Sequence, residues 1–223
     1  MKIKFENLTN IKHEILLFSL LLLLFGQLFI PGEFRSIMRP LLFAQTIFAG
    51  IILFSDKKFW RNLLIILFVF VFCIDLLNYF YDLRFLPFIS GLIYIFFFFS
   101  VSAETYRQIY KAKEVKPAMI AAVFSGFILL CLMAAMFFTL IEFQTPESFS
   151  NLGSGDDRFQ DLSYFSFITT LTIGYGDITP LTMHAKKATM LVALLGNFYS
   201  VFVTGIVIGK YLSRKNELES NNE

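Results

Sequence analysis

The stretch that decides the fold lies near the C-terminal end of the chain and reads YFSFITTLTIGYGDITP over residues 164–180. Gly174 and Gly176 alternate with larger residues in it, and glycine adopts positive φ at little steric cost. Such a backbone lets successive carbonyl groups point to one side. The preceding residues, Asp161 to Leu171, indicate a short helix whose C-terminal end carries partial negative charge. The pattern predicts a helix followed by a loop that offers carbonyl oxygens to a cation.

The rest of the chain has the composition of a membrane protein. Its 223 residues are 57% hydrophobic, with 30 Phe and a mean hydropathy of +0.67, whereas soluble domains are about 45–50% apolar. A bilayer core of about 30 Å needs about 20 apolar residues per helix. We therefore expect an all-α membrane protein with six spans: Glu14–Ile30, Ser36–Phe54, Trp60–Phe80, Phe85–Ala103, Pro117–Phe143 and Ala185–Leu212.

The stretch 164–180, set between the last two spans, resembles the pore loop of the potassium channel superfamily. Potassium channels are themselves the standard example of a filter built from backbone carbonyls, with Val where this chain has Ile173. The resemblance implies a selectivity filter at Thr172, Ile173, Gly174, Tyr175 and Gly176. It implies K⁺ bound by the carbonyls of the first four residues and by the Thr172 hydroxyl. K⁺ is then the transported ion, and no cofactor is expected.

Three residues are expected to support the filter from outside it: Asp177, Phe165 and Thr169. Two departures from the family concern Asp177. Tyr164 and Phe165 stand where many members carry Trp, and Phe165 has no N–H to donate to that carboxylate. Ile168 stands where some members place a Glu that also bonds it. We therefore expect Asp177 to be held less firmly than in relatives.

The six-span layout resembles that of voltage-gated potassium channels, but the basic residues of a voltage sensor are absent. The fourth span has no Lys or Arg between Arg84 and Arg107. Steep gating needs charge that moves through the field, at about 2.3 kcal/mol per charge per 100 mV. We expect no steep voltage sensing. Asp75, the acid inside the third span, is interpreted either as part of a structural salt bridge or as the remnant of a sensor's countercharge.

The expected organisation is a four-helix domain followed by a two-helix pore domain with a re-entrant pore helix. Its segments are a cytoplasmic N-terminus (1–13), the voltage-sensor-like four-helix domain (14–116), the pore domain (117–212) and a short cytoplasmic tail (213–223). We expect no regulatory domain after the last span, which leaves regulation to a separate subunit open. Lys and Arg favour the cytoplasmic side, and thirteen of the 19 fall there if both termini are inside. We expect a multi-pass plasma-membrane protein.

Gly196 and the acidic outer segment each have two possible interpretations. Gly196 in the last span is either a gating hinge or a site of close helix packing, which small residues permit. The outer segment 142–161 is rich in acidic residues, including Glu142 and Asp161. It either concentrates cations at the pore mouth or is a solvated surface with no specific role.

One chain carries one filter segment, whereas a ring of carbonyls around an axis needs four. A homotetramer with cyclic symmetry is therefore expected, with membrane lipid and K⁺ as its other partners. The alternatives are a non-selective cation channel, a non-conducting auxiliary subunit and a transporter. An enzyme is not expected, because the two histidines, His13 and His184, fall on opposite sides of the membrane. Cys73 and Cys131 lie in apolar spans and suggest no metal site, and the net charge of +2 is too small to indicate nucleic-acid binding.

Overall fold

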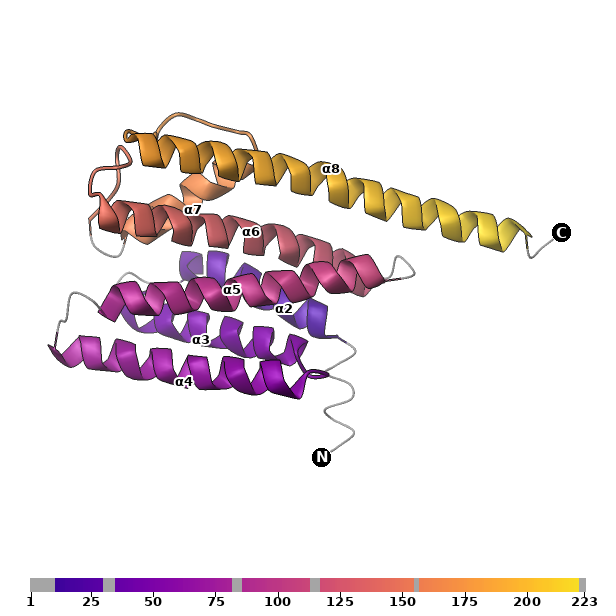
Figure 1. Cartoon of the computed structure of the whole chain (residues 1–223), viewed down its shortest axis with the longest axis horizontal. Coiled ribbons are helices and arrows are strands. Elements are labelled where there is room, and N and C mark those ends of the chain that lie inside the picture. The colour runs from indigo at the N-terminus through magenta and orange to yellow at the C-terminus, as the bar shows by residue number, and fades with distance from the viewer. Residues whose placement is uncertain (1–10, 30–34, 82–85, 113–116, 155–156, 221–223) are drawn as a thin grey trace. The chain divides into compact units, whose positions relative to one another are not determined.

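The computed structural model describes residues 11–29, 35–81, 86–112, 117–154 and 157–220. Its elements are α2 (Lys12–Phe25), the 3-10 turn η1 (Gly26–Phe29), α3 (Arg35–Leu53), α4 (Lys58–Tyr81), α5 (Leu86–Lys111), α6 (Pro117–Gln144), α7 (Asp157–Thr170) and α8 (Met183–Ser220). Figure 1 labels the α-helices. Within these ranges the only strand-like pairing is one bridge between Phe149 and Pro180. The predicted all-α class is confirmed.

Each of the six expected spans is a helix, with shifted limits. The first ends earlier than expected because α2 stops at Gly26, and glycine is among the poorest helix formers. The fourth continues to Lys111 at its C-terminal end. Among the described residues, three helices are long and apolar enough to cross a membrane: Phe88–Lys111, Ala118–Gln144 and Met183–Lys210. Leu41–Leu53 is a shorter apolar helix.

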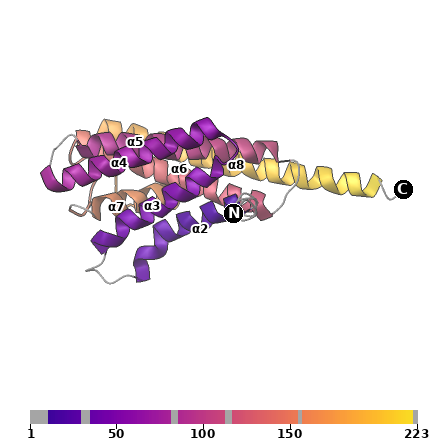
Figure 2. The same cartoon turned by 90° about the horizontal axis from the view of Figure 1, so that it is seen from below.

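The chain divides into two compact units, Met1–Gly126 and Phe127–Glu223, and the division falls within α6. In the first unit α2 packs against α3 and α4 against α5, and α3 also contacts α4 and α5; the pair α2 and α3 is seen side by side in Figure 2. Fully buried leucines such as Leu16 and Leu20 on α2 fill this core. Gln45 on α3 donates to the Ser19 carbonyl at 2.8 Å, which adds a polar tie between α2 and α3.

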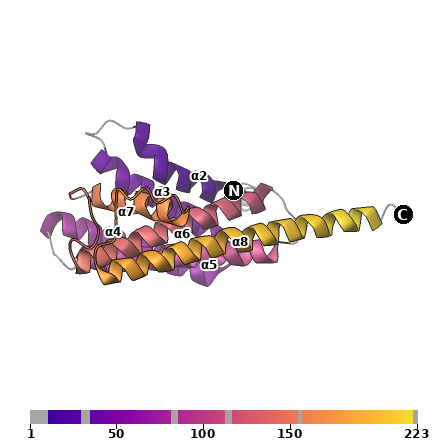
Figure 3. The same ribbon diagram turned by 90° about the horizontal axis from the view of Figure 1, so that it is seen from above.

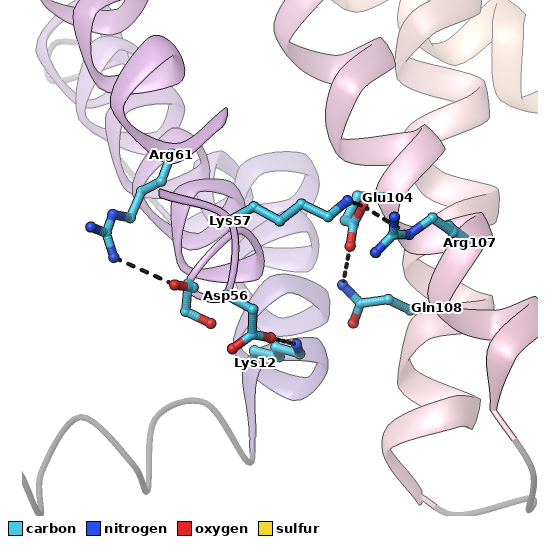
Figure 4. Close-up of polar contacts among 8 residues, drawn as sticks. Lys12, Asp56, Lys57, Arg61, Glu104, Arg107 and Gln108 are labelled. Carbon is cyan, nitrogen blue, oxygen red and sulfur yellow. Dashed lines mark hydrogen bonds and ion pairs between the residues drawn. The ribbon is translucent and has the colours of Figure 1, made fainter. Parts of the chain in front are cut away.

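A cluster of charged side chains joins the α3–α4 connection to α5 (Figure 4). Glu104 on α5 is buried, with a side chain only 7% exposed. Its carboxylate pairs with Lys57 and, at 3.5 Å, with Arg107, and it accepts a hydrogen bond from Gln108 at 2.9 Å. Removing one partner from a buried ion pair is strongly destabilising, so these contacts fix the position of the connection. We call these four residues the Glu104 cluster.

In the second unit α7 packs against α8. The core between them contains residues from α6, α7, α8 and both loops that flank α7: Ala134, Phe138, Phe149, Leu162, Phe165, Ile168, Ile178, Ala185, Ala188 and Val192. Helix α8 runs without interruption from Met183 to Ser220, as Figure 3 shows along its length. The loop after α7 is thus carried on a packed α6–α7–α8 core.

Candidate functional site

The loop after α7 has a backbone that alternates in handedness. Thr172, Gly174 and Gly176 have φ of +59°, +57° and +82°, whereas Ile173 and Tyr175 between them do not have positive φ. Alternation of this kind turns successive peptide planes so that their carbonyls face the same side. The positive φ expected at both glycines is confirmed. That of Thr172 was not predicted, and it is uncommon for a residue other than glycine.

Amide groups of this loop are tied back to the end of α7. Ile173 N–H and Gly174 N–H both donate to the Ile168 carbonyl, at 2.8 and 3.3 Å, and Thr172 N–H donates to the Thr169 carbonyl at 3.0 Å. The carbonyls of residues 172–175 accept no hydrogen bond within the part of the chain that the structure describes. A carbonyl group that is shielded from water needs a partner that takes the place of a hydrogen-bond donor. Four free carbonyls in series therefore form a strip of oxygens that suits a dehydrated cation.

Asp177, directly after the loop, is held by a hydroxyl group from α7. Tyr164 Oη donates to Asp177 Oδ2 at 2.7 Å. This hydrogen bond lowers the pKa of Asp177 and, as its largest effect on the donor, raises the pKa of Tyr164 to about 12. The sequence argument for a less firmly held Asp177 overlooked this donor, and the comparison with relatives stays a prediction. That argument considered only an N–H donor at the family's Trp position, whereas the hydroxyl group of Tyr164 reaches the Asp177 carboxylate.

Phe165, the next residue, supports the loop through the core instead. Its ring lies 5.3 Å from that of Phe138 and 5.5 Å from that of Phe149, and these two rings are 5.3 Å apart. Such spacings suit tilted and edge-to-face aromatic pairs. Ser166 Oγ on the same helix donates to the Cys131 carbonyl of α6 at 2.9 Å. Together these contacts set the position of α7 behind the loop.

Gly196 of α8 lies against the last residue of α7. A Cβ at residue 196 would be 2.5 Å from Thr170 Cγ2 and 2.9 Å from the Thr170 carbonyl oxygen. Thr170 cannot easily turn aside, because its hydroxyl donates to the Ser166 carbonyl at 2.6 Å and the residue is buried. Since α8 is also unbroken here, the geometry favours close packing over the hinge as the reason for this glycine. Sequence reasoning missed Thr170, whose role depends on which helix faces meet.

The acidic segment 142–161, which extends from the end of α6 into α7, is less available to cations than the sequence suggested. Glu142 is buried, and its two oxygens accept from the Glu147 and Ser148 N–H groups, both at 2.9 Å. Asp161 Oδ2 accepts from Gly153 N–H at 2.7 Å. Exposed acids in this segment include Glu147 and Asp157, whereas Asp156 lies outside the described residues. The segment is therefore a folded structure with only part of its charge facing outward.

The remaining residues singled out from the sequence lie away from this loop. The side chain of Asp75 and all of Arg84 lie outside the described residues. His13 is buried at the start of α2, and His184 is exposed at the start of α8. Within the described ranges no three His, Cys, Asp or Glu side chains are grouped as a metal ion would require.

Comparison with known proteins matches this site to one family. Residues 124–213 match the family described as "Ion channel". Over 93 residues, 41% of this chain, the sequence is 30% identical to "Two pore potassium channel c" of Oryza sativa subsp. japonica, and the match spans 20% of that protein's length. No solved structure matches the chain significantly. The matched segment contains α7, the alternating loop and most of α8, so this part of the chain is similar to the ion-channel domains of the potassium channel superfamily.

Proposed function

We propose that the chain is a subunit of a potassium-selective channel that conducts K⁺ passively through residues 172–176. The alternating φ values with four free carbonyls carry this proposal. A K⁺ ion must shed its water in a narrow pore, and rings of carbonyl oxygens replace that hydration shell. The oxygens of Thr172, Ile173, Gly174 and Tyr175 supply one quarter of each ring. K⁺ is the transported ion, and the proposal includes no cofactor.

A homotetramer is the assembly that fits a single chain with one filter strip. Large apolar side chains are exposed on the loop and on α8 of the isolated chain, among them Tyr175 and Phe198, each 72% exposed, and Phe202, 63% exposed. Contiguous apolar surface of this kind marks an interface with protein or lipid. Cyclic closure of four copies places the loop on the axis and covers this surface.

The proposed setting is the plasma membrane, with both termini and the Glu104 cluster on the cytoplasmic side. The distribution of Lys and Arg supports this orientation. It also places the filter entrance outside the cell. The helices α2 to α5 form the proposed four-helix transmembrane domain, and the absence of basic residues from most of α5 supports weak or no voltage dependence.

A matched pair of glycine variants tests the conduction pathway. In liposomes that contain the full chain and a K⁺ gradient, Gly174→Ala should abolish K⁺ flux, since alanine at φ +57° is strained. Gly26→Ala in the first unit should preserve flux, because Gly26 has φ of −59° and its new Cβ would meet only leucine side-chain atoms, at 3.3 Å or more. Equal flux through both variants would exclude the loop as the pathway. Equal K⁺ and Na⁺ flux through the wild type would point to a non-selective cation channel.

A further inference from the structure

The segment after α6 is paired with the segment that follows the filter. Ser150 N–H donates to the Thr179 carbonyl at 2.9 Å, and Leu181 N–H donates to the Ser148 carbonyl at 2.8 Å. Thr179 N–H in turn donates to Ser150 Oγ at 2.8 Å. These bonds surround the antiparallel bridge of Phe149 and Pro180. We call the paired segments 148–151 and 177–181 the clasp.

Asn151 extends the clasp to the end of the filter. Its side-chain Nδ2 donates to the Asp177 carbonyl oxygen at 2.6 Å. Asn151 itself has φ of +55°, a conformation that asparagine tolerates better than most residues. Asp177 is thus held at two points, its carboxylate by Tyr164 from α7 and its carbonyl by Asn151 from the clasp.

The clasp is anchored to α6 through the buried carboxylate of Glu142. The two oxygens of this carboxylate accept hydrogen bonds from Ser148 N–H, at the start of the clasp, and from Glu147 N–H, directly before it. Glu147 also has positive φ, +64°. Residues in such conformations persist when the surrounding structure over-determines them. A continuous set of contacts therefore runs from the end of α6 to the last filter residues.

We propose that Asn151 is a positioning residue that fixes the Asp177 carbonyl and thereby keeps the outer end of the filter, Gly176 and Asp177, in its conducting conformation. The effect of Asn151 on current rests on the proposed function. The local ordering of residues 174–178 by the clasp does not depend on that function. Without the Asn151 hydrogen bond, the flexible Gly176 is free to rotate its peptide groups, since no side chain restrains it. Loss of this bond therefore loosens the outer end of the filter and shortens the time for which the filter conducts.

The test is amide hydrogen exchange, read by mass spectrometry on peptides covering residues 174–181 of the full chain in detergent. Asn151→Gly introduces a residue that tolerates the positive φ, and Asn151→Asp keeps the shape of the side chain. Neither variant has a side-chain N–H group that can donate to the Asp177 carbonyl. In both variants the amides of residues 174–181 should exchange about fivefold faster than in the wild type, the value for loss of one ordinary hydrogen bond. Amide exchange in α6 and α8 should be unchanged. The matched control is Glu147→Gly, which changes the other strained residue of the same loop and removes no donor to Asp177. It should leave this exchange unchanged.

Repeating the exchange in K⁺ and in Na⁺ separates this inference from the proposed function. We expect K⁺ to slow exchange of residues 174–178 in every variant and the Asn151 variants to show faster current decay at an unchanged reversal potential. Protection by K⁺ without any effect of the Asn151 variants would overturn the positioning role and leave the proposed function intact. Faster exchange in the Asn151 variants without K⁺ protection would support the clasp and contradict a K⁺ site.

Discussion

Substitution of Gly196 by alanine distinguishes the two roles considered for this residue. A hinge role predicts a more stable α8, because alanine is favoured over glycine in a helix by about 1 kcal/mol. The packing role predicts the opposite. The new methyl group would lie 2.5 Å from Thr170 Cγ2 and 2.9 Å from the Thr170 carbonyl oxygen, both well inside contact distance.

The size of the expected change in stability depends on whether the atoms around the new methyl group can move. Thr170 Cγ2 belongs to a β-branched side chain whose hydroxyl is already bonded to Ser166, and the second contact is backbone at the end of α7. Overpacking at such a site typically costs 1–3 kcal/mol. After the gain in helix propensity of about 1 kcal/mol, we expect Gly196→Ala to be destabilised by about 1 kcal/mol and Gly205→Ala, with open space around its Cβ, to be stabilised by a similar amount.

The assay is thermal or denaturant unfolding of the purified full chain in one detergent, with both variants measured beside the wild type. Thr170→Ser removes the Cγ2 methyl group that the new side chain strikes, so the double variant Gly196→Ala/Thr170→Ser should recover part of the loss. A Gly196→Ala chain as stable as Gly205→Ala, with no coupling to residue 170, would refute the packing argument and restore the hinge.

Three further predictions concern contacts described above. Tyr164→Phe removes the donor to Asp177, so the pKa of Asp177 should rise toward its ordinary 3.8 in a titration followed by NMR, with faster current decay; an unchanged pKa would show that the bond does not form. In the wild type, this bond contributes to stability above pH 3.8, and its contribution is lost at lower pH as Asp177 becomes protonated. On the alkaline side the contribution is present below pH 10 and is lost as the pH rises toward the Tyr164 pKa of about 12. Phe165→Ala should reduce the free energy of unfolding by about 3–5 kcal/mol and Phe165→Leu by much less, since a leucine fills most of the aromatic core; equal losses in a denaturant titration would contradict a packing role. Glu104→Gln should cost about 2 kcal/mol in the same titration, because Lys57 and Arg107 lose a charged acceptor, whereas Lys58→Gln nearby should cost little; equal effects would remove the Glu104 cluster from the account of the first unit.

The sequence predicted what depends on local pattern. Apolar runs predicted the helices α2 to α6 and α8, and Gly174 and Gly176 predicted the positive φ of the loop, because a helix period and a missing Cβ act within a few residues. It also placed α7 before the loop, although the helix begins at Asp157, four residues earlier than expected.

Features that depend on which surfaces meet were not predicted. The contact of Gly196 with Thr170 requires knowledge of how α7 crosses α8, and no spacing in either helix reveals it. Glu142 reads as one acid in an acidic segment, yet both its oxygens hold backbone N–H groups. The bond between Tyr164 and Asp177 was accessible in principle, because the Tyr hydroxyl is a donor located where the family has Trp. The positive φ of Thr172 and Asn151 has no local signal in the sequence beyond the tolerance of Asn.

The most direct test of the central claim is the reversal potential of the purified chain in a planar bilayer, with K⁺ and Na⁺ in opposed gradients. The free carbonyls of residues 172–175 predict a current that reverses near the equilibrium potential of K⁺. A clear current that reverses near zero would contradict the account, because the loop would then conduct without selecting K⁺ over Na⁺.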